Sequence, residues 1–311
     1  MKSKVITYCV IGLVVIGGLL YFNNISSSVK PRVLGLSINT FYSNKNFDVD
    51  KIPEKKDGVE DPIVLSDSAV LIEEGTKYPL YSKNDREPVA IASITKVMTY
   101  LVARENYDFE DIVTVGENLP RVIGSMIVVQ EGEQISVESL IYGLLVNSGN
   151  DAAHALAYKS GSIEEFVKLM NDKAFQLGMN DTHFVDPAGL DDNGRSSAFD
   201  VAILFSHALS DEMFVKFVGT SEKEVSSTDG QIVHNLRNSN RLVTGDIPMD
   251  GVVGGKTGFT LDAGHTLVCA AERDGARLIS VILKTHVNTK TASAYQSRNL
   301  LNWGFDSFSF Y

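Results

Sequence analysis

Ser93 and Lys96 stand three residues apart at the start of a segment whose apolar residues have helical spacing. Apolar side chains recur through 94–102 at intervals of three and four, which predicts a helix with one buried face. We therefore expect Ser93 in the first turn of this helix, on the same face as Lys96. A lysine beside a serine can take the hydroxyl proton and make the serine a nucleophile. Because a free lysine is protonated at neutral pH, the pair can work only if burial or a second cation lowers the pKa of the amine.

Two further short motifs follow in the chain: Ser148–Asn150, which reads Ser-Gly-Asn, and Lys256–Gly258, which reads Lys-Thr-Gly. The first lies between two segments of helical spacing and is predicted to form a tight turn, whereas the second lies in a strand-like segment. Each motif is common by itself, and Ser27–Lys30 repeats the serine-lysine spacing in a polar stretch without helical pattern. A helix start, a turn and a strand in this order match the three-motif site of penicillin-binding proteins and serine β-lactamases.

Strand-like segments at both ends of the folded region enclose a helical block. Helical spacing runs through 137–145, a second helical pattern starts directly after Asn150, and a capping box at 162–165 begins a third helix. Residues 200–209 read as one more helix, and a closing helix is expected over 289–303. The strand-like segments are 69–72, 78–81, 252–258, 265–272 and 276–284. One sheet built from both ends of the chain, with the helices as an inserted layer, predicts the α+β class.

The composition argues against several kinds of function. A net charge of −11, without a clustered basic surface, argues against nucleic acid as a partner. The two cysteines, Cys9 and Cys269, lie in an apolar run and in a distant strand-like segment, so we expect no disulfide. The six histidines show no metal-ligand spacing, and we predict neither a metal site nor a cofactor.

The N-terminal residues 5–22 are apolar and uncharged, and they follow Lys2 and Lys4. This length and this flank are typical of a single membrane-spanning helix or of a long signal peptide. A poor cleavage signature favours the anchor, while the flanking charges do not fix its orientation. We therefore divide the chain into a membrane anchor or signal peptide (1–23), a polar linker (24–65) and a catalytic domain (66–311).

The segment from about residue 66 to 304 resembles the low-molecular-weight D-alanyl-D-alanine carboxypeptidases of the S11 serine peptidase family. The matching stretches are 92–99, 148–152, 178–184, 255–260 and 303–305. The resemblance implies a β-lactamase/transpeptidase-like fold, with an antiparallel sheet flanked by helices and an all-helical lobe that holds the Ser-Gly-Asn turn. It also implies an enzyme that removes the terminal D-alanine from peptidoglycan stem peptides and binds penicillin covalently.

The same resemblance implies the catalytic roles. Ser93 would attack the carbonyl between two D-alanines, and Lys96 would take its proton while the charge of Lys256 helps to hold Lys96 neutral. Ser148 would pass a proton to the departing amine. The backbone N–H groups of Ser93 and Phe259 would hold the negative charge that develops on the carbonyl oxygen. Water would then release the acyl group.

Five positions are assigned to substrate binding by the resemblance, and one of them is Phe259 through the backbone N–H just described. Asn150 would hold the substrate amide, and Lys256 with Thr257 would hold the terminal carboxylate. Gly258, which has no side chain, would let the substrate backbone lie against the strand edge. Some family members hold the carboxylate with an arginine after the last strand, and Lys290 is the nearest basic candidate in this chain.

The expected partners are peptidoglycan stem peptides ending in D-Ala-D-Ala, β-lactam antibiotics as covalent inhibitors, and the membrane through the N-terminal helix. Larger family members carry a β-rich domain and an amphipathic anchor after the catalytic domain, whereas this chain ends at Tyr311. We therefore expect the N-terminal helix to replace that anchor. Because polymerised peptidoglycan exists only outside the membrane, we expect a cell-membrane protein whose catalytic domain is extracytoplasmic.

Three alternative functions use a similar site. A D,D-endopeptidase would cut cross-links with the same residues, and the sequence does not separate this activity from trimming of stem peptides. A class A β-lactamase needs a deacylating glutamate in a Glu-x-x-Leu-Asn segment, and neither Glu164 nor Glu165 begins one. A penicillin sensor needs a cytoplasmic output domain, and only residues 1–4 precede the apolar run.

Overall fold

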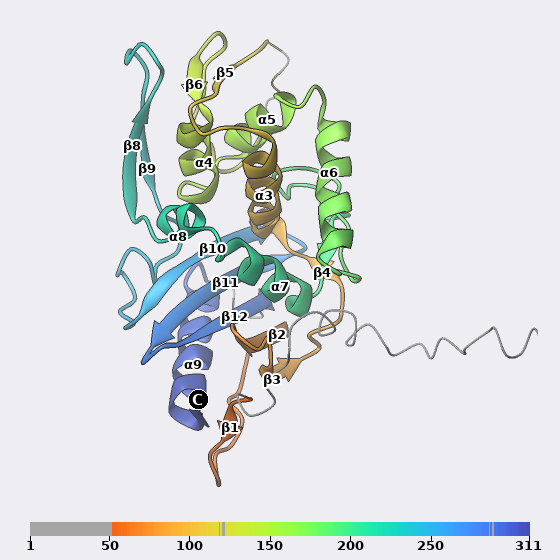
Figure 1. Cartoon of the computed structure of the whole chain (residues 1–311), viewed down its shortest axis with the longest axis vertical. Coiled ribbons are helices and arrows are strands. Elements are labelled where there is room, and N and C mark those ends of the chain that lie inside the picture. The colour runs from red at the N-terminus through yellow and green to blue at the C-terminus, as the bar shows by residue number, and fades with distance from the viewer. Residues whose placement is uncertain (1–51, 118, 120–121, 286, 288) are drawn as a thin grey trace, which may run out of the picture. The chain divides into compact units, whose positions relative to one another are not determined.

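The strands from the two ends of the folded region form one five-stranded antiparallel sheet (Figure 1). The computed structural model describes residues 52–117, 119, 122–285, 287 and 289–311. The strand order across the sheet is β10 (Val252–Thr260), β11 (Gly264–Arg273), β12 (Ala276–Thr285), β2 (Ser66–Glu73) and β3 (Pro79–Lys83). Ser280 at the centre of β12 is opposite Cys269 of β11 and Leu71 of β2. The predicted α+β class, with strands from both ends in one sheet, is confirmed.

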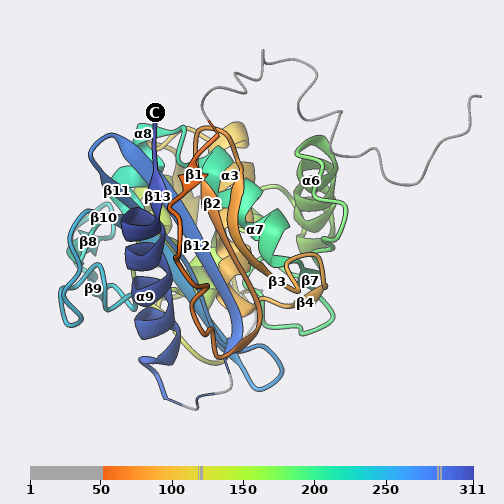
Figure 2. The ribbon, with the colours of Figure 1, turned by 90° about the horizontal axis from the view of Figure 1, so that it is seen from below.

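Both faces of this sheet are covered by helices. Alternate residues of a strand face opposite sides, so Val70 packs into the core below α7 (Ala198–Ala208) while Leu71 packs against Leu300 of α9 (Ala292–Ser307). Figure 2 shows α7 and α9 on opposite sides of β12. Burial on both faces explains why 69–72 is a continuous apolar run rather than an alternating one.

A helical lobe packs beyond α7. Its helices are α3 (Lys96–Asn106), α4 (Val137–Leu145), α5 (Asn150–Tyr158), α6 (Ile163–Gln176) and α8 (Glu212–Val218). Serine side chains cap two of them, because the hydroxyl of Ser136 accepts the N–H of Ser139 at α4 and that of Ser162 accepts the N–H of Glu165 at α6. The helices expected from apolar spacing are present, and α8 is an additional one.

Three short strand pairs surround the lobe. They are β4 (Val89–Ala90) with β7 (Arg195–Ser196), β5 (Ile112–Thr114) with β6 (Gln134–Ser136), and β8 (Glu222–Ser226) with β9 (Val233–Arg237). The β8–β9 hairpin gave no clear sequence signal, because most of its residues are polar and exposed and Val225 is the buried residue of β8.

The domain begins before residue 66. Strand β1 (Glu54–Lys55) pairs with β13 (Phe308–Ser309) at the other end of the chain. The indole N–H of Trp303 also donates to the carbonyl of Glu60 at 2.9 Å. Residues 54–61, which we expected in the linker, are therefore attached to the folded domain.

Within the described residues, no helix combines the length and the apolar character needed to cross a membrane. The anchor expected over 1–23, and the linker up to residue 51, lie outside the part of the chain that the structure describes.

Phe217 of α8 fixes this helix to the lobe, and its removal should measure that contact. The ring is fully buried, with centroids 4.6 Å from Tyr142, 5.8 Å from Phe109 and 6.0 Å from Tyr100. We predict that Phe217→Ala lowers the free energy of unfolding by about 3–5 kcal/mol through the cavity that it leaves. Denaturant unfolding measures this, and Phe175→Ala, at a ring that is 85% exposed, should stay within about 0.5 kcal/mol of the parent.

Candidate active site

Ser93 lies in a short 3₁₀ turn, η2 (Ala92–Thr95), and Lys96 is the first residue of α3. The hydrogen bond expected from their spacing is present, with Lys96 Nζ 2.8 Å from Ser93 Oγ. The local conformation differs from the expected first helical turn, because Ala92 adopts a positive φ of 48°. The chain therefore enters η2 through a sharp bend, which leaves Ser93 partly accessible while Lys96 is fully buried.

The Lys96 amine has two other partners, and both can only accept a hydrogen bond from it. Asn150 Oδ1 lies 2.7 Å from Nζ, and the carbonyl oxygen of Ala188 lies 2.6 Å from it. A neutral amine has two N–H groups and one lone pair. If its two N–H groups donate to these oxygens, the lone pair is left facing the hydroxyl of Ser93.

Burial is the main reason why the pKa of Lys96 lies well below its ordinary value. The positive charge of Lys256 lowers it further, while Asp186 and Asp151 act in the opposite direction. A buried site with a second cation therefore favours the neutral amine that a proton acceptor requires.

Lys256 of β10 belongs to the same site. Its side chain is also fully buried, and Nζ donates to Ser148 Oγ at 2.8 Å and to the carbonyl of Thr257 at 2.9 Å. Burial lowers the pKa of Lys256 to about 7. Lys96 of the first motif is thus bonded to Asn150, and Lys256 of the third motif is bonded to Ser148. Both partners belong to the second motif.

The Ser148–Asn150 turn joins α4 to α5 and is held by a neighbouring loop. Ser148 adopts a positive φ of 60°, and Asn150 begins α5. The loop holds Asn150 at its main chain and at its side chain: the N–H donates to the carbonyl of Ser125 at 2.8 Å, and Nδ2 donates to that of Ile123 at 2.5 Å. These bonds direct Oδ1 toward Lys96.

Asp151 supports this loop rather than serving simply as a helix cap. Its carboxylate accepts the backbone N–H groups of Ile127, Val128 and Val129 at 2.7–3.1 Å. It also accepts the N–H of Ala152 at 3.0 Å. The residue after the Ser-Gly-Asn motif therefore fixes the loop that borders the site.

Gly258 allows β10 to lie against the η2 turn. A Cβ at this position would lie 2.6 Å from Thr266 Oγ1, 2.9 Å from the carbonyl oxygen of Ile91 and 3.0 Å from the backbone N of Ser93. A side chain is therefore excluded by the protein itself, whether or not a substrate also approaches this strand. The next residue, Phe259, is brought near Ser93, and its half-exposed ring stacks on His265 with centroids 4.4 Å apart.

Thr257 has a partner that the sequence did not indicate. Ser239, in the loop after β9, places its Oγ 2.5 Å from Thr257 Oγ1. Burial lowers the pKa of His265, and the charge of Lys290 nearby lowers it further. The structure thus brings Thr257 into the site, and it places Lys290 near the ring that contacts Phe259.

A second supporting loop presents Ala188 to Lys96. One carboxylate oxygen of Asp186 accepts the backbone N–H groups of Ala188, Gly189 and Leu190. Gly189 has a φ of 73°, and a Cβ there would lie 2.0 Å from the carbonyl oxygen of Ala92. The Asp-Pro-Ala-Gly sequence of this loop is a turn signal, but only the fold places it beside residue 96.

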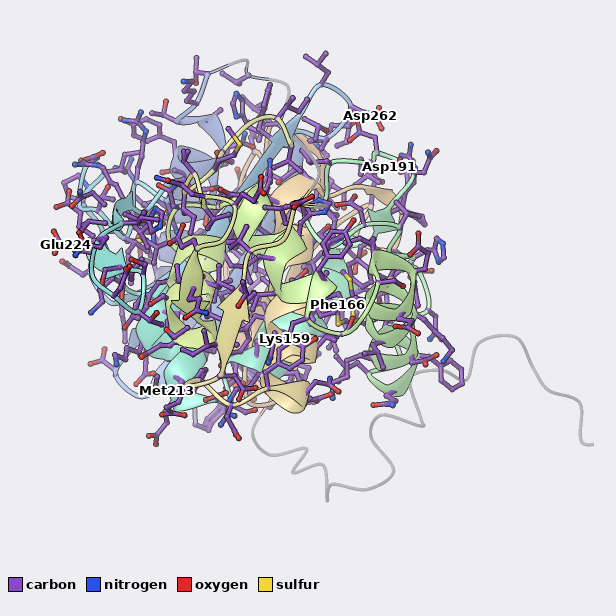
Figure 3. All side chains as sticks on the ribbon, turned by 90° about the horizontal axis from the view of Figure 1, so that it is seen from above. Lys159, Phe166, Asp191, Met213, Glu224 and Asp262 are labelled. Carbon is purple, nitrogen blue, oxygen red and sulfur yellow. The ribbon has the colours of Figure 1, made fainter. Side chains whose placement is uncertain are left out.

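This second loop is tied to the end of β10. Figure 3 labels Asp191 of the loop and Asp262 of the β10–β11 turn on the same side of the molecule. Arg195 donates to Asp262 at 3.2 Å, and Thr260 donates to Asp192 at 2.5 Å. The site is therefore enclosed by two loops that lie far apart in the sequence.

A half-buried serine beside a buried lysine, between an antiparallel sheet and a helical lobe, defines the class of serine acyl-transfer enzymes that use a lysine as proton acceptor. Residues 55–287 match the family of S11 peptidases described as D-alanyl-D-alanine carboxypeptidase. The chain belongs to this family.

Curated relatives cover most of the domain. D-alanyl-D-alanine carboxypeptidase DacF of Bacillus subtilis is 39% identical over 249 residues, which are 78% of this chain and 62% of the relative. DacC of Escherichia coli is 35% identical over 266 residues, which are 80% of this chain and 64% of the relative. The matched regions thus span slightly less than two thirds of each of these relatives.

Solved structures have the same fold. A D-alanyl-D-alanine carboxypeptidase from Mycobacterium tuberculosis matches with a TM-score of 0.74 and 28% identity, covering 81% of this chain and 96% of that chain. A variant of the Streptomyces K15 DD-transpeptidase also matches with a TM-score of 0.74 and 28% identity, covering 79% of this chain and all of that chain. The expected β-lactamase/transpeptidase-like architecture is confirmed.

The lowered pKa of Lys256 predicts a pH dependence of stability. The unfolded lysine binds a proton below about pH 10.4, whereas the folded residue is largely neutral above its pKa of about 7. Between these values the unfolded state binds more protons, so this group makes the free energy of unfolding rise with pH, by up to about 1.4 kcal/mol per pH unit. Below pH 7 both states bind the proton and the slope disappears.

Denaturant unfolding between pH 6 and 10 tests this. We expect Lys256→Met to lack this part of the slope, and the difference from the parent chain reports residue 256 together with the smaller effect of its charge on the pKa of Lys96. Parallel curves for the two proteins between pH 7 and 10 would contradict the assignment.

Proposed function

We propose that this protein is a serine-type D-alanyl-D-alanine carboxypeptidase that removes the terminal D-alanine from peptidoglycan stem peptides. The observation that carries the proposal is the arrangement around Lys96, whose two carbonyl partners direct the amine lone pair at the Ser93 hydroxyl. Family membership supports the choice of substrate, since the relatives are D-alanyl-D-alanine carboxypeptidases by name.

The reaction begins with proton transfer from Ser93 Oγ to Lys96 Nζ while Oγ attacks the carbonyl carbon of the penultimate D-alanine. The backbone N–H groups of Ser93 and Phe259 stabilise the negative charge that develops on the carbonyl oxygen. Ser148, which receives a hydrogen bond from Lys256, relays to the amine of the departing D-alanine the proton that Lys96 took from Ser93, so that Lys96 is neutral again. Hydrolysis of the acyl-enzyme by water then regenerates the hydroxyl of Ser93.

Substrate binding uses the strand side and the loop side of the cleft. Thr257 and Lys256 bind the terminal carboxylate, and the Lys256 charge needed for this is present below its pKa of about 7. Asn150 binds the substrate amide through the polar side chain that also contacts Lys96. Gly258 keeps the edge of β10 free of side-chain atoms, so an extended peptide can lie along it. β-Lactams, which carry a reactive amide and a carboxylate, acylate Ser93 in the same way.

We also propose that residues 1–23 anchor the protein in the cell membrane, with the catalytic domain on the extracytoplasmic side. The apolar run 5–22 supports the anchor, and the location of peptidoglycan supports the orientation. The linker would let the domain reach the cell wall.

The nucleophile and the base are tested by two variants of the full chain. We expect Ser93→Ala to fold normally but to neither bind a fluorescent penicillin covalently nor release D-alanine from a pentapeptide muropeptide. We expect Lys96→Arg to lose about 10²–10⁴-fold in rate, nearly as much as Lys96→Ala, because a guanidinium cannot accept the proton. Mass spectrometry of the products separates trimming from cleavage of cross-links. Covalent labelling of Ser93→Ala would place the nucleophile elsewhere.

The anchor is tested by expressing the full chain and locating it. We expect the protein in the membrane fraction, with the catalytic domain accessible to protease added from outside. A secreted protein that begins near Val29 would show that the apolar run is a cleaved signal peptide.

A further inference from the structure

A buried histidine and a buried glutamate connect the β8–β9 hairpin to the loop beside the active site. His234 of β9 is 5% exposed and Glu133 is 4% exposed. The ring nitrogen Nε2 of His234 lies 2.7 Å from Glu133 Oε1, and Nδ1 lies 2.8 Å from the carbonyl oxygen of Ile127. Figure 1 shows the hairpin alongside α4 and the β5–β6 pair, and a bond from Thr228 N to Gln134 O at 2.7 Å joins them.

Both ring nitrogens of His234 therefore face oxygen atoms. The Ile127 carbonyl can only accept, so Nδ1 must carry a hydrogen. A second hydrogen is then needed between Nε2 and Glu133, either on the imidazole or on the carboxyl group. Glu133 Oε2 is occupied separately, because it accepts the backbone N–H of Gln130 at 2.9 Å. The pair thus holds one proton more than a neutral histidine beside a carboxylate would hold.

The other charged groups on the elements around the pair are exposed or bonded elsewhere. They are Glu131, Glu138, Asp151, Lys216, Glu222, Lys223, Glu224, Asp229 and Arg237. Glu224 projects outward from the hairpin in Figure 3. On β9 itself, the residue that shares the buried face of His234 is Leu236, which is apolar. The bridging proton is therefore held between Glu133 and His234.

Ile127 connects His234 to the Ser148–Asn150 turn. Its carbonyl is held by His234, and its N–H donates to Asp151 Oδ1 at 3.0 Å. Its side chain lies over two glycines: a Cβ on Gly143 would be 2.8 Å from Ile127 Cδ1, and a Cβ on Gly149 would be 3.1 Å from Cγ2. Gly149 is the central residue of the Ser148–Asn150 turn.

We propose that His234 and Glu133 are positioning residues, which share a buried proton and so hold the loop 122–133 against the Ser148–Asn150 turn. The proposal rests on the proposed function of that turn. Loss of the pair releases the Ile127 carbonyl, loosens the loop, and removes the support that fixes Asn150 next to Lys96.

Glu133→Gln is a matched variant that separates geometry from protonation. The amide nitrogen of the glutamine can donate to Nε2 of a neutral imidazole, while its oxygen still accepts the Gln130 N–H. All three hydrogen bonds are then kept without the extra proton. His234→Ala removes two of them, and Asn235→Ala, at the exposed neighbouring residue, is the control for damage to the hairpin.

The rate of covalent labelling by a fluorescent penicillin, measured with the full chain, tests the proposal. At pH 7 we expect His234→Ala to label about tenfold more slowly or worse, which corresponds to the loss of one buried hydrogen bond. We expect Asn235→Ala and Glu133→Gln to label at nearly the parent rate.

Hydrogen exchange at the Ile127 and Val128 amides gives a readout that does not need activity. We expect faster exchange in His234→Ala than in the parent. A folded His234→Ala protein with parental labelling and exchange would overturn the positioning role. If His234→Ala does not fold, parental labelling and parental exchange in Glu133→Ala, which removes both hydrogen bonds of the carboxylate, would overturn the role of the pair. If the parent itself is not labelled, the proposed function fails, whereas hydrogen exchange still decides whether the pair holds the loop.

Discussion

The burial of the Lys96 amine is the constraint on which the site depends. A charged amine in such a place is costly, and a neutral one is tolerated only if its N–H groups find acceptors. Asn150 and Ala188 supply these acceptors from two different parts of the chain. The geometry that makes the buried amine acceptable is therefore the same geometry that leaves a lone pair for Ser93.

Each acceptor needs its own support. Ala188 is presented by a turn whose N–H groups converge on Asp186, and Asn150 is held by the loop that Asp151 and the His234–Glu133 pair fix in place. Positive φ angles at Ala92 and Ser148 add local strain, of order 1–3 kcal/mol each, that the surrounding contacts must hold. Ala92 directly precedes Ser93, and Ser148 is itself a proposed catalytic residue. The backbone strain therefore lies next to both proposed catalytic hydroxyls.

Local patterns in the sequence predicted the sheet, most of the helices and the three motifs, because apolar periodicity and turn residues are local signals. The supports of the site could not be predicted in this way. Asp186 holds the loop that contacts Lys96, although the two residues are 90 positions apart in the sequence. His234 contacts Glu133, which is 101 positions away. The contact of Ser239 with Thr257 could not be predicted either, because a single serine in a polar stretch does not indicate a contact with a distant strand. The 3₁₀ turn at Ser93 was also missed, because it depends on Gly189 meeting Ala92, and apolar spacing does not record that contact.

The pairing of β1 with β13 determines how the domain would bear mechanical load. Any force transmitted along the chain from its N-terminal side reaches the folded part through two residue pairs, Glu54 with Ser309 and Lys55 with Phe308. The contact of Trp303 with Glu60 lies next in line, on α9. In Figure 1 these elements lie at the opposite end of the molecule from the helical lobe. Tension applied from the N-terminal side would therefore load these two residue pairs first, while the site around Ser93 keeps its geometry.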